Sequence, residues 1–88
     1  MKYGVITTGS FSITANTLTI VTACSKSDFT NWKSVAGIST ILSIWVDGGY
    51  GDNFQMTASE YGGQLMIQIQ SKYAATVTSS FKVYIIGI

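Results

Sequence analysis

The chain has 88 residues, of which 47% are hydrophobic and only 10% are charged, and its net charge is +1. Its five cations are all lysines and are scattered, so the clustered arginines typical of nucleic-acid binding are missing, and we expect no nucleic-acid partner. Histidine is absent and cysteine occurs once, which excludes zinc sites built from Cys and His, intrachain disulfides and catalysis by an imidazole base.

Alternation of apolar and small polar residues indicates that the chain begins with short β-strands. Lys2–Thr7 is the first predicted strand, and Phe11–Ile13 continues the alternation after a glycine. Thr17–Ala23 is the next, with Leu18 and Ile20 on one face. Proline is absent and glycine is frequent, which fits strands joined by tight turns.

The segment Ser25–Ser34 is polar and carries two aromatic residues, Phe29 and Trp32, three positions apart. We expect a loop or an irregular strand here, with a short helix capped by Ser27 as the alternative. Cys24 ends the preceding alternating run, so we expect it to be a small buried hydrophobic residue. An interchain disulfide and a reactive thiol are the alternatives for this cysteine.

The longest apolar run is Ile38–Val46, which holds five β-branched residues and a tryptophan among its nine positions. Apolar residues on both faces of this run predict a strand that is covered on both sides. Trp45 within it is expected in the core or at a subunit interface. Asp47–Asn53 follows with three glycines, which predicts an exposed turn.

The clearest strands lie in the second half of the chain. Asn53–Glu60 and Gln64–Gln70 alternate cleanly on either side of Tyr61-Gly62-Gly63, which predicts a tight hairpin. The outward glutamines, with Met66 among them, predict a solvated face, and a polar layer between subunits is the alternative. Phe81–Ile88 is apolar on both faces, so we expect it to lie centrally in a sheet or at an interface, because a free apolar edge would aggregate.

These elements predict one all-β domain over residues 1–88, a small antiparallel β-sandwich of six to eight short strands. So small a domain has a thin core, and its few charges leave apolar surface on the outside. We therefore expect the chain to be a homo-oligomer.

Three stretches resemble the small C-terminal β-sandwich domains of bacteriophage tail fibres and receptor-binding proteins, which are similar to H-type lectins. They are the closing strand FKVYIIGI over Phe81–Ile88, the opening Tyr3-Gly4 before alternating Thr/Ser-rich strands, and the run Leu18–Cys24. The resemblance covers the chain in outline and rests on composition and spacing. It implies a trimer at the tip or along the shaft of a fibre, which binds a bacterial surface glycan or protein.

Candidate ligand-binding residues are aromatic side chains in the predicted turns and loop. Tyr50 and Tyr61 each lie next to glycine, and Asp52 and Asn53 are close in sequence to the first of them. An exposed ring packs against the apolar face of a sugar while amides and carboxylates bind its hydroxyls, and Trp32 in the polar segment is a further candidate. The alternative is that each tyrosine packs over its own turn.

The carboxylates are few. Asp47 and Asp52 in the glycine-rich loop are a candidate calcium site, although the spacing is not that of an EF-hand and an ordinary solvated turn is the expectation. The only other acidic residues are Asp28 and Glu60, and a glycosidase needs two carboxylates at a set separation with one raised pKa. We therefore expect no catalytic residues, no cofactor and no enzyme activity.

The function expected from these observations is that of a non-enzymatic, virion-associated module, a phage tail-fibre or receptor-binding domain that contacts a host surface glycan or protein. The alternatives are a purely structural phage protein, such as a capsid decoration or tail subunit, and a free-standing lectin. No signal peptide is visible and no apolar run is long enough to cross a bilayer. We therefore expect synthesis in the host cytoplasm, no membrane insertion and incorporation into a particle.

Overall fold

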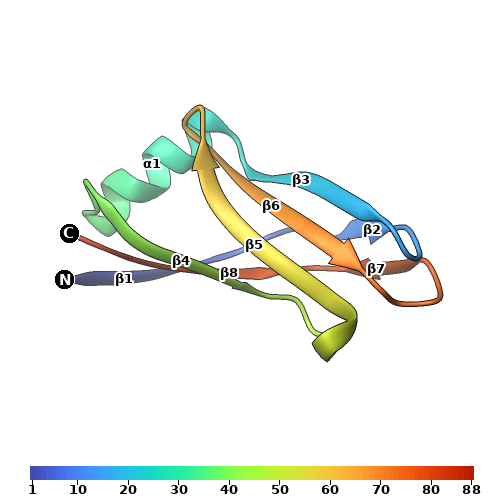
Figure 1. The fold of residues 1–88 in the computed structure, drawn as a ribbon. Coiled ribbons are helices and arrows are strands. Elements are labelled where there is room, and N and C mark those ends of the chain that lie inside the picture. Colours follow the sequence, from blue (N-terminus) through green and yellow to red (C-terminus); the bar gives the residue numbers. More distant parts are fainter.

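The computed structural model describes residues 1–88 and is mostly β, with about 55% of the residues in strands (Figure 1). Every strand pairing is antiparallel. The elements in chain order are β1 (Lys2–Thr7), β2 (Phe11–Ile13), β3 (Leu18–Cys24), α1 (Lys26–Ala36), β4 (Ile41–Asp47), the 3₁₀ turn η1 (Gly51–Asn53), β5 (Phe54–Tyr61), β6 (Gln64–Ser71), β7 (Val77–Ser79) and β8 (Lys82–Gly87). The predicted antiparallel β architecture is thus confirmed, with one short helix added.

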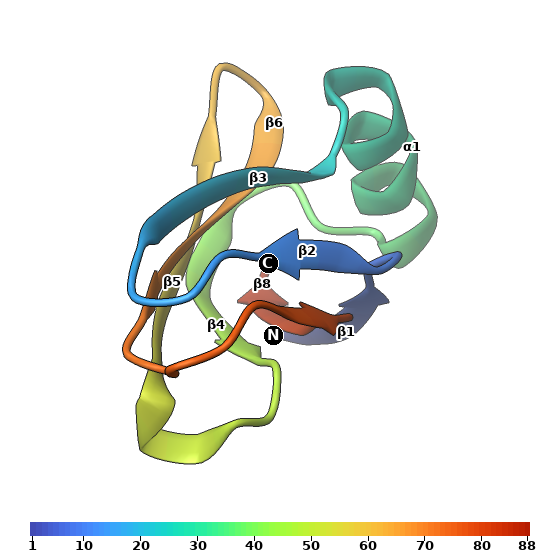
Figure 2. The same cartoon turned by 90° about the vertical axis from the view of Figure 1, so that its right-hand side faces the viewer.

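The strands form two three-stranded sheets, β1-β8-β4 and β3-β6-β5, and a two-stranded sheet, β2-β7. The β2-β7 pair continues the β1-β8 pair, and at the join the Thr8 amide donates to the Phe81 carbonyl at 2.8 Å while the Phe81 amide donates to the Thr8 hydroxyl at 2.9 Å. Figure 2 shows β2 and β7 in front with β1 and β8 behind them. The two ends of the chain are therefore paired along a single bent ladder.

The core consists of ten buried apolar residues that come from most of these elements. The largest share of these core residues comes from β6 and β8, because every second residue of these strands points inward. The ten are Ile13, Phe29, Ile38, Phe54, Leu65, Ile67, Ile69, Phe81, Val83 and Ile85. The inward residues predicted for the hairpin strand β6, Leu65, Ile67 and Ile69, are confirmed.

The closing strand β8 lies centrally in its sheet, which is one of the two positions expected from the sequence, the other being a subunit interface. β8 lies between β1 and β4, and its residues Val83 and Ile85 are fully buried. Its other face carries Tyr84 and Ile86, which are half-buried. An apolar strand is therefore kept from being a free edge by a partner on each side.

The prediction of a strand over Ile38–Val46 that is covered on both sides is wrong within the single chain. The strand begins at Ile41, pairs only with β8 and forms an edge of its sheet. A register shift between Ile41 and Ser43 is a β-bulge, and it interrupts the strict alternation that the sequence suggested. Leu42 and Trp45 are consequently exposed, while Ile38 is buried separately, before the strand begins.

The prediction of a loop over Ser25–Ser34 is also wrong, and the helical alternative is correct. The cap is Ser25 rather than Ser27, because the Ser25 hydroxyl accepts a hydrogen bond from the Asp28 amide at 3.3 Å. Gly37 ends the helix in the left-handed conformation, with a φ of 71°. The polar composition of the segment hid these two signals, which together define the 11-residue helix.

Helix α1 is held to the sheets by its two aromatic residues and by one ion pair. Phe29 is buried and stacks on Trp32, with ring centroids 6.0 Å apart. The Trp32 ring lies against Gly4 of β1 so closely that a Cβ at this glycine would be 2.5 Å from it. Lys33 and Glu60 of β5 form an ion pair at 2.6 Å.

We expect that Ser25→Ala lowers the free energy of unfolding by about 1 kcal/mol, because the Asp28 amide loses its partner at the helix N-terminus. Ser34→Ala is the matched control, because this exposed serine of the same helix makes no side-chain hydrogen bond, and it is expected to change stability by less than about 0.5 kcal/mol. Urea unfolding followed by tryptophan fluorescence at one protein concentration measures both. Equal effects of the two substitutions would contradict the assignment of the cap.

Candidate functional site

The loop after β4 holds three of the residues predicted to bind a ligand. Tyr50 packs against Phe54 and Tyr73, with ring centroids 4.9 and 5.4 Å away. Asp52 and Asn53 lie in the 3₁₀ turn that follows. Tyr50 thus packs against two aromatic rings while 38% of it stays exposed, and its role in ligand binding stays a prediction.

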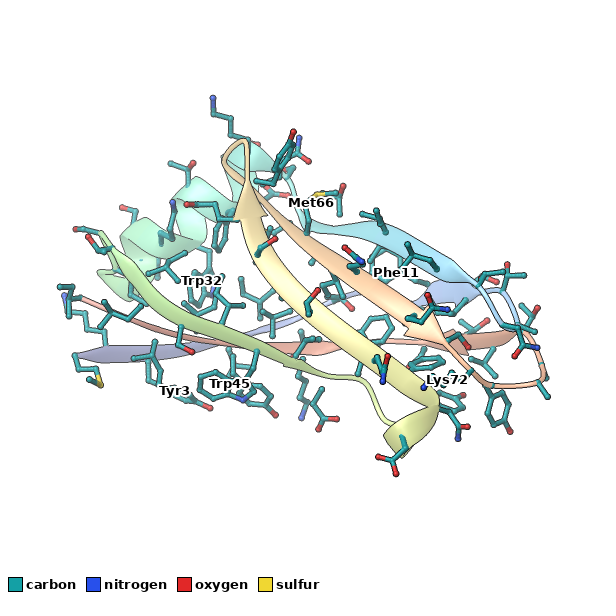
Figure 3. The ribbon with its side chains drawn as sticks, in the orientation of Figure 1. Tyr3, Phe11, Trp32, Trp45, Met66 and Lys72 are labelled. Carbon is teal, nitrogen blue, oxygen red and sulfur yellow. The ribbon has the colours of Figure 1, made fainter.

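The other two predicted residues lie elsewhere. Trp32 is half-buried between α1 and the sheets (Figure 3). Tyr61 ends β5, whereas Tyr50 precedes it, so the eight-residue strand separates them by roughly 23 Å. The structure therefore does not bring the predicted ligand-binding residues together into one site.

The calcium candidates lie at the two ends of the same loop. One Asp47 carboxylate oxygen accepts a hydrogen bond from the Gly49 amide at 3.3 Å, which stabilises the turn. The structure contains no group of three or more His, Cys, Asp or Glu side chains that could hold a metal ion. No third His, Cys, Asp or Glu side chain joins Asp47 and Asp52, and the calcium hypothesis stays a prediction.

A hollow of about 300 Å³ lies on the outer face of the β3-β6-β5 sheet. Six residues line it: Ile20, Thr57, Ser59, Tyr61, Met66 and Gln68. Cross-strand pairing places Ile20 and Thr57 on either side of Gln68. We call these six residues the sheet hollow.

Polar groups in the sheet hollow are free to bind a ligand. The structure gives the side chains of Thr57, Ser59 and Gln68 no hydrogen-bond partner within the chain. Met66 forms part of the floor, and its sulfur accepts a hydrogen bond from the neighbouring Thr22 hydroxyl at 3.4 Å. The hollow therefore combines apolar contacts with unused donors and acceptors.

Sequence reasoning found only part of the sheet hollow. The outward positions of β5 and β6 followed from alternation, and Tyr61 was already a candidate. What it missed was that β3 pairs with β6, which brings Ile20 opposite Gln68 across 48 positions of sequence. Alternation alone does not specify such a pairing.

A second exposed surface covers the outer face of the β1-β8-β4 sheet. Register places Val5, Tyr84 and Trp45 side by side in one row and Tyr3 beside Ile86 in the next. The Tyr84 ring stacks with Trp45 at 5.6 Å and with Tyr3 at 6.4 Å. Tyr3 is 60% exposed and Trp45 is 42% exposed. We call these five residues the aromatic face, and Figure 3 shows Tyr3 and Trp45 on the opposite side of the molecule from Met66.

No helix in the structure is long and apolar enough to cross a membrane.

The four carboxylates come from different elements. Asp28 is on α1, Asp47 ends β4, Asp52 lies in η1, and Glu60 of β5 is paired with Lys33. The pair of carboxylates that a glycosidase needs at a defined separation is therefore not assembled around the sheet hollow.

The single cysteine is free and half-buried, and it packs against the core. Burial raises the pKa of the Cys24 thiol, and the nearby Asp28 carboxylate raises it further. The folded chain thus holds the thiol proton more tightly than the unfolded chain does. Ionisation of Cys24 therefore opposes folding as the pH rises through the unfolded and then the folded pKa.

We expect iodoacetamide to alkylate Cys24 more slowly in the folded chain than in urea, because the thiolate is the nucleophile and its population is reduced. The rate-against-pH curve of the folded chain should lie at higher pH than that of the unfolded chain. Mass spectrometry of timed aliquots measures both curves. A folded curve displaced toward lower pH would contradict this environment for the thiol.

Comparison with protein-family models, with curated proteins and with solved structures gave no match to this chain. Function is therefore inferred from the two surfaces described above, the sheet hollow and the aromatic face.

Proposed function

We propose that this chain is a non-enzymatic module of a phage-like particle, of the fibre-tip or receptor-binding type. In this proposal it is a small β-sandwich that assembles with copies of itself, with a trimer favoured, and contacts a host surface glycan or protein. The observation that carries the proposal is the aromatic face, an exposed apolar surface on a domain with only 13 buried residues. The resemblance to tail-fibre domains supplies the biological setting.

The geometry of the aromatic face favours a protein partner over a sugar. Tyr84 stacks with Trp45 beside it in the same row and with Tyr3 in the next row, with interplanar angles of 14° and 24°. Each of these rings already has an aromatic neighbour, whereas a sugar needs an open ring face. Apolar side chains from another subunit can pack on such an aromatic cluster.

The charge at the aromatic face favours a second copy of the same chain. The next row along the sheet is Thr7, Lys82 and Asp47, which carries one charge of each sign. The face itself has no ionisable charge at neutral pH, so two copies meet without repulsion. An edge strand with Trp45 exposed is an aggregation hazard unless a defined partner covers it, which supports a closed oligomer.

A purely structural phage protein is the first alternative, because a subunit-packing face alone would suit it. The sheet hollow favours the receptor-binding form, since unpaired polar groups beside an exposed ring are not needed for assembly. A free-standing lectin is the second alternative and would need the hollow but not the aromatic face.

We expect the chain to elute as an oligomer at micromolar concentration, with a mass near three times 9.5 kDa if it is a trimer. Trp45→Lys is expected to shift the chain to monomer, because it places a charge within the aromatic face, while the edge strand that carries it tolerates lysine. Size-exclusion chromatography with light scattering measures the mass, and circular dichroism checks the fold.

Leu18→Lys is the matched control, because Leu18 is a similarly exposed apolar residue, 51% accessible, on the outer face of the other sheet. This variant is expected to keep the wild-type mass. A wild-type chain that is a stable monomer would overturn the assembly proposal. Dissociation by Leu18→Lys but not by Trp45→Lys would place the interface on the β3-β6-β5 sheet and would contradict its assignment to the aromatic face.

A further inference from the structure

The sheet hollow contains the one tyrosine whose ring is left open. Tyr61 is 77% exposed and stacks with no other aromatic ring of the chain. By contrast Tyr3, Tyr50, Tyr73 and Tyr84 each have an aromatic neighbour. The Tyr61 ring is therefore the surface best suited to pack against a flat, weakly polar ligand.

Two further rows of side chains continue from the ring and set the pattern of ligand contacts. Ser59 pairs with Met66, and Thr57 pairs with Gln68. The hydroxyls and the amide both donate and accept hydrogen bonds, while the thioether and Ile20 supply apolar surface. An open ring next to hydroxyl and amide groups matches the two chemical sides of a pyranose, its apolar face and its hydroxyl rim.

The lack of charged side chains in the sheet hollow indicates which class of sugar it can bind. None of its six lining residues is charged at neutral pH. The nearest acidic residue in sequence, Glu60, alternates to the opposite face of β5 and is paired with Lys33 at 2.6 Å. No lining residue is a cation that could bind a carboxylate or a sulfate, so the hollow is suited to neutral sugars.

We propose that the sheet hollow binds a neutral pyranose residue of a glycan, with the ring stacked on Tyr61 and the hydroxyls bound by Thr57, Ser59 and Gln68. The volume of about 300 Å³ lies at the small end of ligand pockets, which suits one or two sugar units. This inference deepens the receptor-binding part of the proposed function and rests on it.

A peptide is the competing occupant, and the position of the hollow disfavours it. The floor of the hollow is β6, which is paired with β3 on one side and β5 on the other. Its backbone groups are therefore used within the sheet and offer none of the main-chain hydrogen bonds by which an extended peptide adds to a sheet. A sugar needs only the side chains that the face presents.

The test is a titration of the ¹⁵N-labelled full chain, followed by two-dimensional NMR, with methyl glycosides of glucose, galactose, mannose and N-acetylglucosamine. N-acetylneuraminic acid serves as the charged probe and a random-sequence octapeptide pool as the peptide probe. We expect saturable shifts for at least one neutral glycoside, confined to amides around Thr57–Tyr61 and Met66–Gln68.

Variants separate the contributions of the ring and the polar groups. Tyr61→Ala is expected to weaken binding roughly tenfold or more, whereas Tyr61→Phe keeps the ring and changes affinity within about threefold. Gln68→Ala should weaken binding several-fold. Gln55→Ala is the matched control, because this exposed glutamine lies on the same face but outside the hollow, and it should leave affinity unchanged.

The proposal is overturned if no neutral glycoside produces saturable shifts, if Tyr61→Ala binds as the wild type does, or if the acidic sugar or the peptide pool binds in preference. The oligomeric mass of the same samples separates this failure from that of the assembly proposal. If the chain is an oligomer that shows no sugar response, only the sugar-binding proposal is refuted. If it is a monomer that binds the sugar, only the interface at the aromatic face is refuted.

Discussion

The pairing of β8 with β1 on one side and β4 on the other is the interaction on which the rest of the structure depends. It buries Val83 and Ile85 in the middle of the domain and gives this apolar strand a partner along both edges. The same pairing brings Tyr3, Tyr84 and Trp45 together on the outside, where their rings stack. These two ladders of hydrogen bonds thus determine the core of one sheet and the character of its outer surface.

The two outer faces differ in how their aromatic rings are used. On the β1-β8-β4 sheet the rings cover one another, so the surface is apolar but has few open ring faces. On the β3-β6-β5 sheet Tyr61 stands alone among hydroxyl and amide side chains. This difference in ring packing, more than a difference in composition, is why we assign one face to assembly and the other to a ligand.

Much of the fold could be predicted from local pattern, and the failures share a cause. The alternation of Leu65, Ile67 and Ile69 and the Gly62-Gly63 turn are local signals, and both predictions are confirmed. The bulge in β4 could not be predicted, because it depends on register against a strand about 40 positions later. For α1 the signals of its cap and its end were present, but the polar composition outweighed them. The pairing of β3 with β6, which completes the sheet hollow, is likewise a long-range choice that single-sequence periodicity leaves open.

The ladder that joins the two ends of the chain has a consequence for how the domain folds. Lys2 pairs with Gly87 and Ile13 with Val77, so the first strands pair with the last ones. Contacts of such long sequence separation close large loops, which slows folding toward the millisecond-to-second range of β proteins. During synthesis β1 and β4 have no partner until β8 leaves the ribosome, and their apolar residues stay open to wrong pairing. We therefore expect the β1-β8-β4 sheet to form late in folding, once all three strands are present.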